Sequence, residues 1–195
     1  MFRLFRNLFL AAGFVLLTGF TPLNSTANTS TFSKPLPFIS TTYFNVSKGI
    51  DVFTNSLSNK YEEWSLANRN ISKQLFDYAV KGYQYLSEKN ILRKTDIITI
   101  ADLSKPSNQK RLFVINIKTG EVLFNTLVAH GKNSGQEYAK KFSNSESSFE
   151  SSLGFYITTD RYIGKRGYSL RLNGCEKGFN DKANKRAIVV HGAEY

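Results

Sequence analysis

The chain has 195 residues, of which 41% are apolar and 21% charged, so its composition is that of one globular domain with an appendage. A single cysteine excludes an intramolecular disulfide framework and a thiolate zinc cluster, and two histidines exclude a conventional multi-histidine metal site. The groups left for catalysis are the two histidines, the cysteine, carboxylates and hydroxyls.

Residues 1–27 have the pattern of a secretory signal peptide. Arg3 and Arg6 precede an uncharged apolar run at 8–20, which is shorter than the roughly 20 residues of a spanning helix, and small residues at 25–27 offer a cleavage site. The alternative is an uncleaved membrane anchor. We expect an exported protein of the bacterial periplasm or cell envelope, with no stable membrane anchor once the leader is cleaved.

The formal net charge is +11, and it falls to +9 without the leader, which contains two arginines and no acid. A basic protein invites a nucleic-acid partner, but the export signal argues against one. A positive surface on an exported protein suits cell-wall polymer, lipid headgroups or acidic glycans. A basic surface that serves only solubility is an equally good explanation.

Residues 28–94 are predicted to form an N-terminal extension, loosely ordered at first and then helical. Ser72 is the expected N-cap of a helix that runs to about Ser87, with Asn90 as its stop, and a shorter helix around 61–66 is possible. Apolar side chains spaced by three and four predict one buried helical face, formed by Leu75, Phe76, Ala79, Val80, Tyr83 and Leu86.

From residue 96 onward, short β-branched and aromatic runs predict strands. The runs lie at 97–100, 112–115, 122–128, 153–158, 168–172 and 187–190. Lys118-Thr119-Gly120 predicts a hairpin turn, and the polar loop from 130 to about 150 is long enough to suggest a function. The run at 187–190 has the composition of a buried central strand, so we expect a closing element to be missing after it. Residues 95–195 are therefore predicted to be a domain that is incomplete at its C-terminus.

Six segments carry a resemblance to a known family: 100–107 with Lys110-Arg111, 126–135, 142–144, 151–156, 167–172 and 188–193. Together and in this order they resemble the YkuD-like murein L,D-transpeptidases over roughly residues 60–195. The resemblance implies an α+β fold: a β-rich mixed-sheet domain, here an incomplete barrel or sandwich, preceded by the helical extension. It implies neither a metal nor an organic cofactor.

The activity implied by the resemblance is acyl transfer on peptidoglycan stem peptides. A cysteine thiolate attacks a peptide carbonyl, releases the terminal D-amino acid and passes the acyl group to an amine, with an imidazole to hold the proton. The family's His-Gly motif is matched by His191-Gly192, so His191 would be the base and the Gly192 carbonyl would orient its ring. The family nucleophile follows in a Ser-x-Gly-Cys segment, which these 195 residues do not contain. We therefore expect a truncated homologue that is inactive as written.

Three explanations of the missing segment remain open. The sequence is a fragment, or it is a genuine truncated product, or it is a non-catalytic cell-wall binding protein that keeps the substrate-facing loops. The third differs in class, because it predicts saturable binding to peptidoglycan without a change in cross-linking.

Five residues are candidates for the substrate side: His130, Gly131, Ser152, Gly154 and Tyr156. Of these, Ser152 and Gly154 lie in a segment that resembles the family's substrate-facing loop, whereas related enzymes have other residue types where His130 stands. Each has a plainer alternative, since His130 can shape its loop, Gly154 can serve a tight turn and Tyr156 can be a core residue. Cys175 follows a glycine but precedes His191 in the chain, and Leu172-Asn173 does not complete the family motif. A small half-buried apolar role suits this cysteine better than a nucleophilic one.

Overall fold

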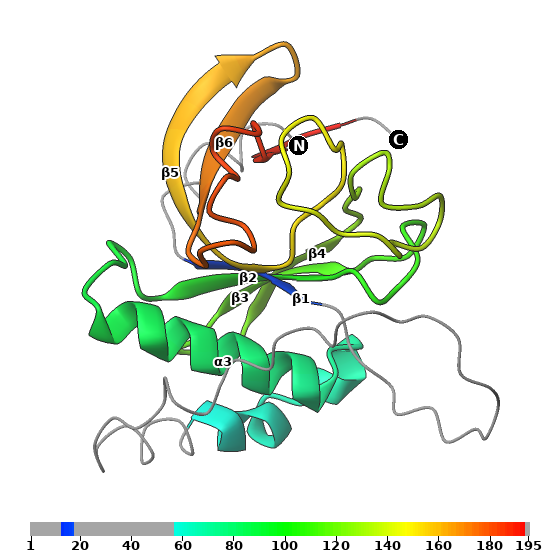
Figure 1. Ribbon diagram of the computed structural model, residues 1–195. Coiled ribbons are helices and arrows are strands. Elements are labelled where there is room, and N and C mark those ends of the chain that lie inside the picture. Colours follow the sequence, from blue (N-terminus) through cyan, green and yellow to red (C-terminus); the bar gives the residue numbers. More distant parts are fainter. Residues whose placement is uncertain (1–12, 18–56, 194–195) are drawn as a thin grey trace, which may run out of the picture.

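The computed structural model describes residues 13–17 and 57–193, which form an α+β chain (Figure 1). Most of the predicted leader, and residues 28–56 of the predicted N-terminal extension, lie outside these residues. Within the described part, no helix has the length and apolar character needed to cross a membrane.

Helices precede the main run of strands. Residues 57–63 are helical, a 3₁₀ turn η2 follows at Leu66–Arg69, and the long helix α3 spans Lys73–Glu88. The helix expected around 61–66 thus begins earlier and ends at 63, where Ser65 takes a left-handed backbone conformation. Leu57 and Leu66 are buried, so both short elements are held by their contacts with the core rather than by their own length.

Both ends of α3 lie where the sequence predicts them. The Ser72 hydroxyl accepts a hydrogen bond from the Leu75 amide at 3.2 Å, which satisfies one of the free donors of the first turn. At the other end Asn90 adopts φ +53°, and the Ile91 amide donates to the Leu86 carbonyl at 3.2 Å. This pairing is a Schellman motif, and it explains why asparagine stops the helix here.

The strands form two antiparallel groups of three. The first group is β2 (Ile97–Asp102), β3 (Leu112–Asn116) and β4 (Val122–Thr126); the second is β5 (Gly154–Gly164), β6 (Gly167–Gly174) and β7 (Val189–His191). Each of the six predicted runs overlaps one of these strands. Strands β5 and β6 are longer than predicted, because they pair with each other along an extended hairpin.

The last predicted run begins later as a strand than the sequence indicates. β7 begins at Val189, lies beside β6 at the edge of the sheet that the described residues form, and is half-buried to exposed. An apolar run of this length does not show which strands lie beside it, because the neighbours of a strand come from distant parts of a chain.

Five residues of the predicted leader form β1 (Gly13–Leu17), which joins the two groups into one sheet of order β4-β3-β2-β1-β5-β6-β7. β1 runs parallel to β2, with Leu17 opposite Asp102, and antiparallel to β5, with Gly13 opposite Ile157. Cleavage after residue 27 would therefore remove the strand that lies between β2 and β5.

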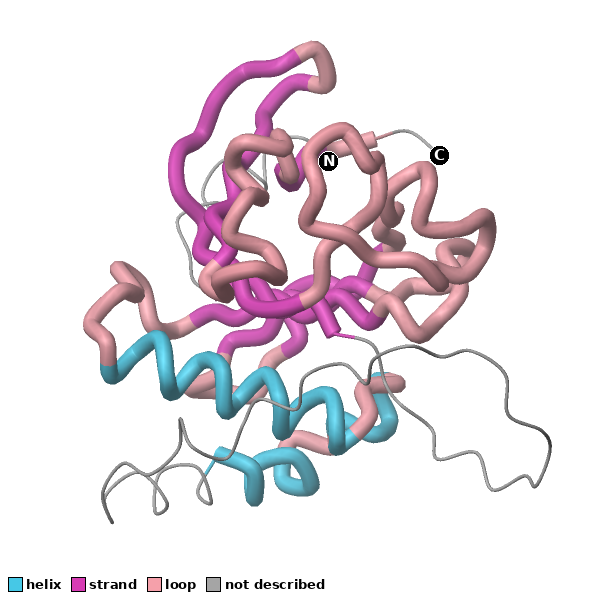
Figure 2. The backbone as a smooth tube through the Cα atoms, in the orientation of Figure 1, coloured by secondary structure: helices cyan, strands magenta, loops and turns pink. Residues whose placement is uncertain are grey.

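The main core lies between α3 and the first group of strands, as Figure 2 shows from the side. The buried face of α3 is the predicted one, and it packs against Ile98 and Ile100 of β2 and Phe113 and Ile115 of β3. The predicted domain boundary at residue 95 falls between α3 and β2, two elements that share this core.

Gly82 shows how closely α3 approaches β5. A Cβ atom at this position would lie 2.0 Å from Cε1 of the buried Phe155 ring. We expect Gly82→Ala to lower the free energy of unfolding by about 1–3 kcal/mol, because overpacking outweighs the helix propensity that alanine adds. Denaturant unfolding measures this, with Lys81→Ala on the exposed side as the control. A more stable Gly82→Ala protein would show that this close packing is wrong.

Candidate functional site

The first element of the site is the histidine at the end of β7. His191 lies opposite Ser169 of β6 and is exposed, and its Nδ1 is 2.8 Å from the carbonyl oxygen of Gly192. A carbonyl only accepts hydrogen bonds, so Nδ1 carries the proton and Nε2 holds the lone pair. In the neutral ring this tautomer leaves Nε2 as the nitrogen that can accept a proton.

The second histidine has the opposite tautomer and a different environment. Arg111 Nη2 lies 2.8 Å from Nδ1 of His130, and since a guanidinium only donates, this nitrogen must accept. Its Nε2–H then donates to the Gly135 carbonyl at 3.2 Å. Both ring nitrogens are engaged within the protein, so His130 shapes the loop that begins at its own position.

Arg111 organises this part of the site and is fully buried. Its Nη1 donates to the Lys105 carbonyl at 2.6 Å, and its Nε and Nη2 donate to the Val128 carbonyl at 3.0 and 2.9 Å. One guanidinium thus ties the turn after β2 to the chain after β4 and holds His130. The sequence indicated Arg111 only as part of the family resemblance, because nothing local marks it as buried.

A second arginine holds the polar loop that precedes β5. Arg186 Nη1 donates to the Ser143 carbonyl at 2.6 Å and to the Ser152 hydroxyl, while Nη2 donates to the Ser148 hydroxyl at 3.0 Å and to the Glu150 carbonyl. Sequence reasoning missed this role, since Arg186 lies about 40 residues from its partners and appears only as half of a basic pair. Its fork of donors explains how a loop without helix or strand keeps one shape.

Two of the predicted substrate-side residues, Ser152 and Gly131, pack against other parts of the chain. The Ser152 hydroxyl is buried and donates to the Ser143 carbonyl at 2.9 Å. The Gly131 amide donates to the Ser151 hydroxyl at 2.9 Å, and a Cβ on Gly131 would lie 2.5 Å from the Phe149 carbonyl oxygen. The backbone at position 131 lies so close to residues 149–151 that a side chain would not fit, which is sufficient to explain the glycine.

Gly154 begins β5 with φ +117°, a conformation that side chains disfavour. A Cβ here would meet the Glu176 carboxylate and the Asn180 amide, both within 3 Å. Glycine at 154 thus leaves room for the turn at 175–180. In that turn Glu176 Oε2 accepts a hydrogen bond from the Phe155 amide at 2.7 Å.

Tyr156 is a core residue, and it packs beneath the segments that carry the candidate site residues. It is 1% exposed, its hydroxyl donates to the Ser152 carbonyl at 2.8 Å, and burial raises its pKa above the ordinary value. It packs in a small apolar cluster on which Val128 and Val190 also lie. Since these two valines closely precede His130 and His191, the cluster brings the two histidine-bearing segments and the 152–156 segment onto one support.

Cys175 does not have the environment of a nucleophile. Burial, and to a lesser extent the neighbouring Glu176 carboxylate, raise its pKa to about 12. The group is therefore a thiol at neutral pH, and it packs against the main core. This agrees with the small apolar role that the sequence favoured.

Comparison with known protein families assigns the chain to a family. A model described as the L,D-transpeptidase catalytic domain matches residues 67–195, more than half of the chain. The chain belongs to the L,D-transpeptidase catalytic-domain family. Searches of curated proteins and of solved structures gave no match.

The family match includes α3 and all six strands from β2 to β7, so the helix lies within the matched L,D-transpeptidase region. It also includes both histidines and the two arginines that organise the loops. Among the residues that the structure describes, no group of three or more histidine, cysteine, aspartate or glutamate side chains is placed to hold a metal ion.

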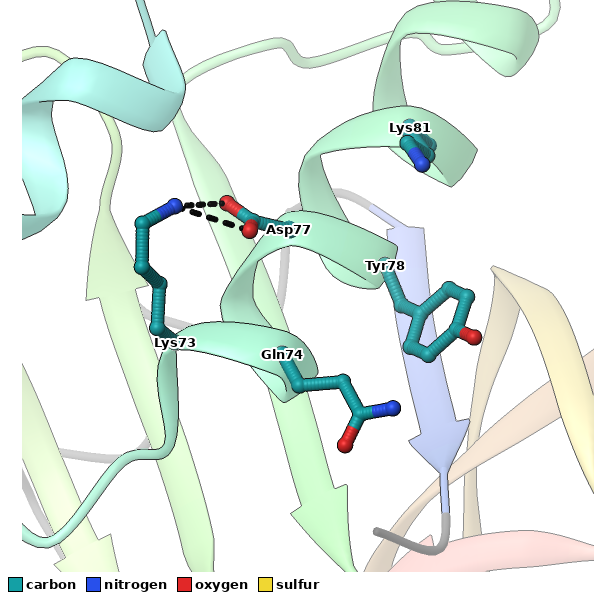
Figure 3. A pocket seen from close by; sticks show the side chains of 5 residues that line it. All are labelled: Lys73, Gln74, Asp77, Tyr78 and Lys81. Atoms are coloured by element: carbon teal, nitrogen blue, oxygen red, sulfur yellow. Dashed lines mark hydrogen bonds and ion pairs between the residues drawn. The ribbon is translucent and has the colours of Figure 1, made fainter. Parts of the chain in front are cut away.

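A surface depression on the outer side of α3 lies apart from this site. It is lined by Lys73, Gln74, Asp77, Tyr78 and Lys81, and Figure 3 shows Lys73 paired with the Asp77 carboxylate at 2.8 Å. In Figure 1, α3 and β7 lie on opposite sides of strands β2, β3 and β4. None of the predicted site residues of the L,D-transpeptidase domain lines it.

The contribution of the Glu176 carboxylate to stability can be tested, because it accepts the Phe155 amide of β5. Burial raises its pKa, although the Phe155 amide that it accepts acts in the opposite direction. A raised pKa in the folded state means that the protonated form is favoured, so its contribution to stability is greatest below about pH 4.5 and declines as the pH rises through the folded-state pKa.

We expect the stability of Glu176→Gln, relative to the parent chain, to increase from pH 4 to pH 7, because the amide keeps an acceptor without a charge. Glu176→Ala removes the acceptor of the buried Phe155 amide and should cost about 1–3 kcal/mol at both pH values. Denaturant unfolding at the two pH values tests this. A Gln variant whose relative stability falls between pH 4 and pH 7 would contradict the assignment.

Proposed function

We propose that this chain derives from an enzyme that performs cysteine-dependent acyl transfer on peptidoglycan stem peptides, with His191 as its general base. The observation that carries the proposal is the 2.8 Å contact between His191 Nδ1 and the Gly192 carbonyl at an exposed strand end. It leaves Nε2 as the proton acceptor and supports the imidazolium that forms when that proton arrives.

In each half of the reaction His191 takes up one proton and then returns it. Nε2 takes the thiol proton, and the thiolate attacks the carbonyl carbon of the donor peptide to form a tetrahedral adduct. As the adduct collapses, the imidazolium returns its proton to the departing D-amino acid and a thioester remains. The acceptor amine then attacks the thioester, gives its proton to Nε2, and the thiol recovers a proton as the new amide forms.

The nucleophile in this proposal is not Cys175. Its pKa of about 12 keeps the thiol protonated, and the 195 residues contain no Ser-x-Gly-Cys segment. We place the reactive thiol and its oxyanion donors outside these residues, together with the structure that would close the sheet into the expected barrel or sandwich. The 195-residue chain alone is then inactive.

The remaining predicted residues act on the substrate side in this proposal. The loop at His130 and Gly131 and the segment at Ser152, Gly154 and Tyr156 rest on the same apolar cluster as the strand that carries His191. We propose that their backbone and the loops they hold form the wall against which the stem peptide lies. The protein would work outside the cytoplasm, where the predicted leader would take it.

One observation favours a second candidate, a non-catalytic cell-wall binding protein. The single cysteine of the chain is half-buried and protonated at neutral pH, so the loops are held in shape without a reactive thiol among these residues. Such a protein would bind isolated peptidoglycan saturably and leave its cross-links unchanged.

The experiment compares two proteins on one substrate. The gene is read past codon 195, and both the 195-residue chain and the full in-frame product are incubated with a tetrapeptide stem donor. We expect the full product to release the terminal D-amino acid in a reaction that thiol alkylation blocks, and the 195-residue chain to release none. If neither protein releases it and both bind isolated peptidoglycan, the binding function replaces the enzymatic one.

A further inference from the structure

The β5–β6 hairpin extends beyond the body of the protein and carries exposed apolar side chains at its tip. In Figures 1 and 2 it is the long curved pair of strands that rises away from α3. Ile163 is 77% exposed and Tyr168 is 56% exposed, and the two lie directly opposite each other across the hairpin. Two facing residues of this kind form one continuous apolar surface at the end of a projection.

Cationic side chains surround this pair. Lys165 and Arg166 form the exposed turn, and Arg161 is exposed two residues before Ile163. Further down the hairpin the Arg171 guanidinium lies over the Tyr162 ring, 4.5 Å from its centroid. Residues 160–171 thus contain four cations and a single carboxylate, that of Asp160.

The backbone of the tip is already satisfied by its own pairing. Strands β5 and β6 remain in register from Arg161 opposite Leu170 to Gly164 opposite Gly167, and Gly167 takes the turn conformation at φ +81°. A hairpin paired in this way can enter an apolar medium without exposing free amides or carbonyls along its inner edge.

From these features we propose that the tip of the β5–β6 hairpin docks reversibly on a lipid bilayer with anionic headgroups. Ile163 enters the edge of the hydrocarbon, and the Tyr168 ring lies at the level of the headgroups with its hydroxyl in water. Lys165, Arg166 and Arg161 pair with lipid phosphates around them. A bilayer suits the tip better than a sugar polymer, because an aliphatic side chain gains free energy in hydrocarbon and offers a glycan no hydrogen bond.

Docking would also fix where the candidate site lies. β7 pairs with β6 so that His191 is opposite Ser169, the residue next to Tyr168. A hairpin held at a membrane would keep this histidine close to the bilayer surface. The proposal does not depend on the acyl-transfer activity, since it rests on the hairpin alone.

The test is co-sedimentation of the full chain with vesicles of phosphatidylcholine that contain 30% phosphatidylglycerol or none. Neutralising the turn with Lys165→Gln and Arg166→Gln together should weaken binding to the anionic vesicles roughly 25-fold, about fivefold for each cation. Replacing the apolar pair with Ile163→Ser and Tyr168→Ser should weaken it about tenfold or more. Because the leader is present in every variant, its own affinity for lipid is a constant background.

Two matched controls change the same chemistry elsewhere on the surface. Lys73→Gln with Lys81→Gln removes two charges from the outer side of α3, and Ile91→Ser removes an apolar side chain that is 43% exposed. Both should bind the anionic vesicles as the parent chain does. The proposal is overturned if the hairpin variants bind as well as the controls, or if they lose binding to isolated peptidoglycan while vesicle binding stays unchanged.

Discussion

Replacement of His191 by alanine should lower the rate of acyl transfer by the full in-frame product about 10²- to 10⁴-fold, the usual contribution of a positioned general base. The reason is geometric: the Gly192 carbonyl holds Nδ1–H at 2.8 Å, so Nε2 is the nitrogen that can take the thiol proton. Release of the D-amino acid from a tetrapeptide donor measures the rate.

Two control variants separate this effect from damage to the fold. Gly192→Ala keeps the backbone carbonyl, and a Cβ there would meet no other atom within 4 Å, so its rate should stay within a few-fold of the parent. Cys175→Ser should likewise remain active. Full activity in His191→Ala would show that the base lies elsewhere.

Replacement of Arg111 by methionine should lower the free energy of unfolding by more than about 3 kcal/mol. The change leaves the carbonyls of Lys105 and Val128 and Nδ1 of His130 without the donor that now serves all three. Arg111→Lys should recover only part of the loss, because one ammonium group cannot reproduce the planar fork.

Denaturant unfolding tests this prediction, with Lys110→Met as the matched control at the exposed neighbouring position. That variant should stay within about 0.5 kcal/mol of the parent chain. If Arg111→Met were equally mild, the buried guanidinium would not be what holds the loops of the site.

The parts of the fold that were predicted correctly are those that depend on the local sequence pattern. The serine cap, the apolar face and the asparagine stop of α3 lie within one segment, so their physics can be read without the rest of the chain. The strand runs from 97 to 172 were recognisable for the same reason. What local pattern does not contain is the neighbour of each strand, so the order of the strands in the sheet required the structure.

The elements that the sequence did not indicate all depend on distant contacts. The leader contributes β1 through pairing with strands more than 80 residues away, although its apolar run was interpreted only as an export signal. Arg186 resembles any other surface cation until the 143–152 loop is folded around it. The family resemblance predicted the roles of His191 and Gly192, whereas the supporting positions of Ser152 and Tyr156 required the structure, because their burial is not visible in the sequence.

The central claim is that this L,D-transpeptidase site uses His191 with a thiol that is not Cys175. The most direct measurement is to react the full in-frame product with an acylating stem-peptide analogue and to locate the adduct by mass spectrometry of its peptides. We predict an adduct on the cysteine of a Ser-x-Gly-Cys segment encoded beyond residue 195 and none on Cys175. An adduct on Cys175, lost in Cys175→Ser, would contradict the account.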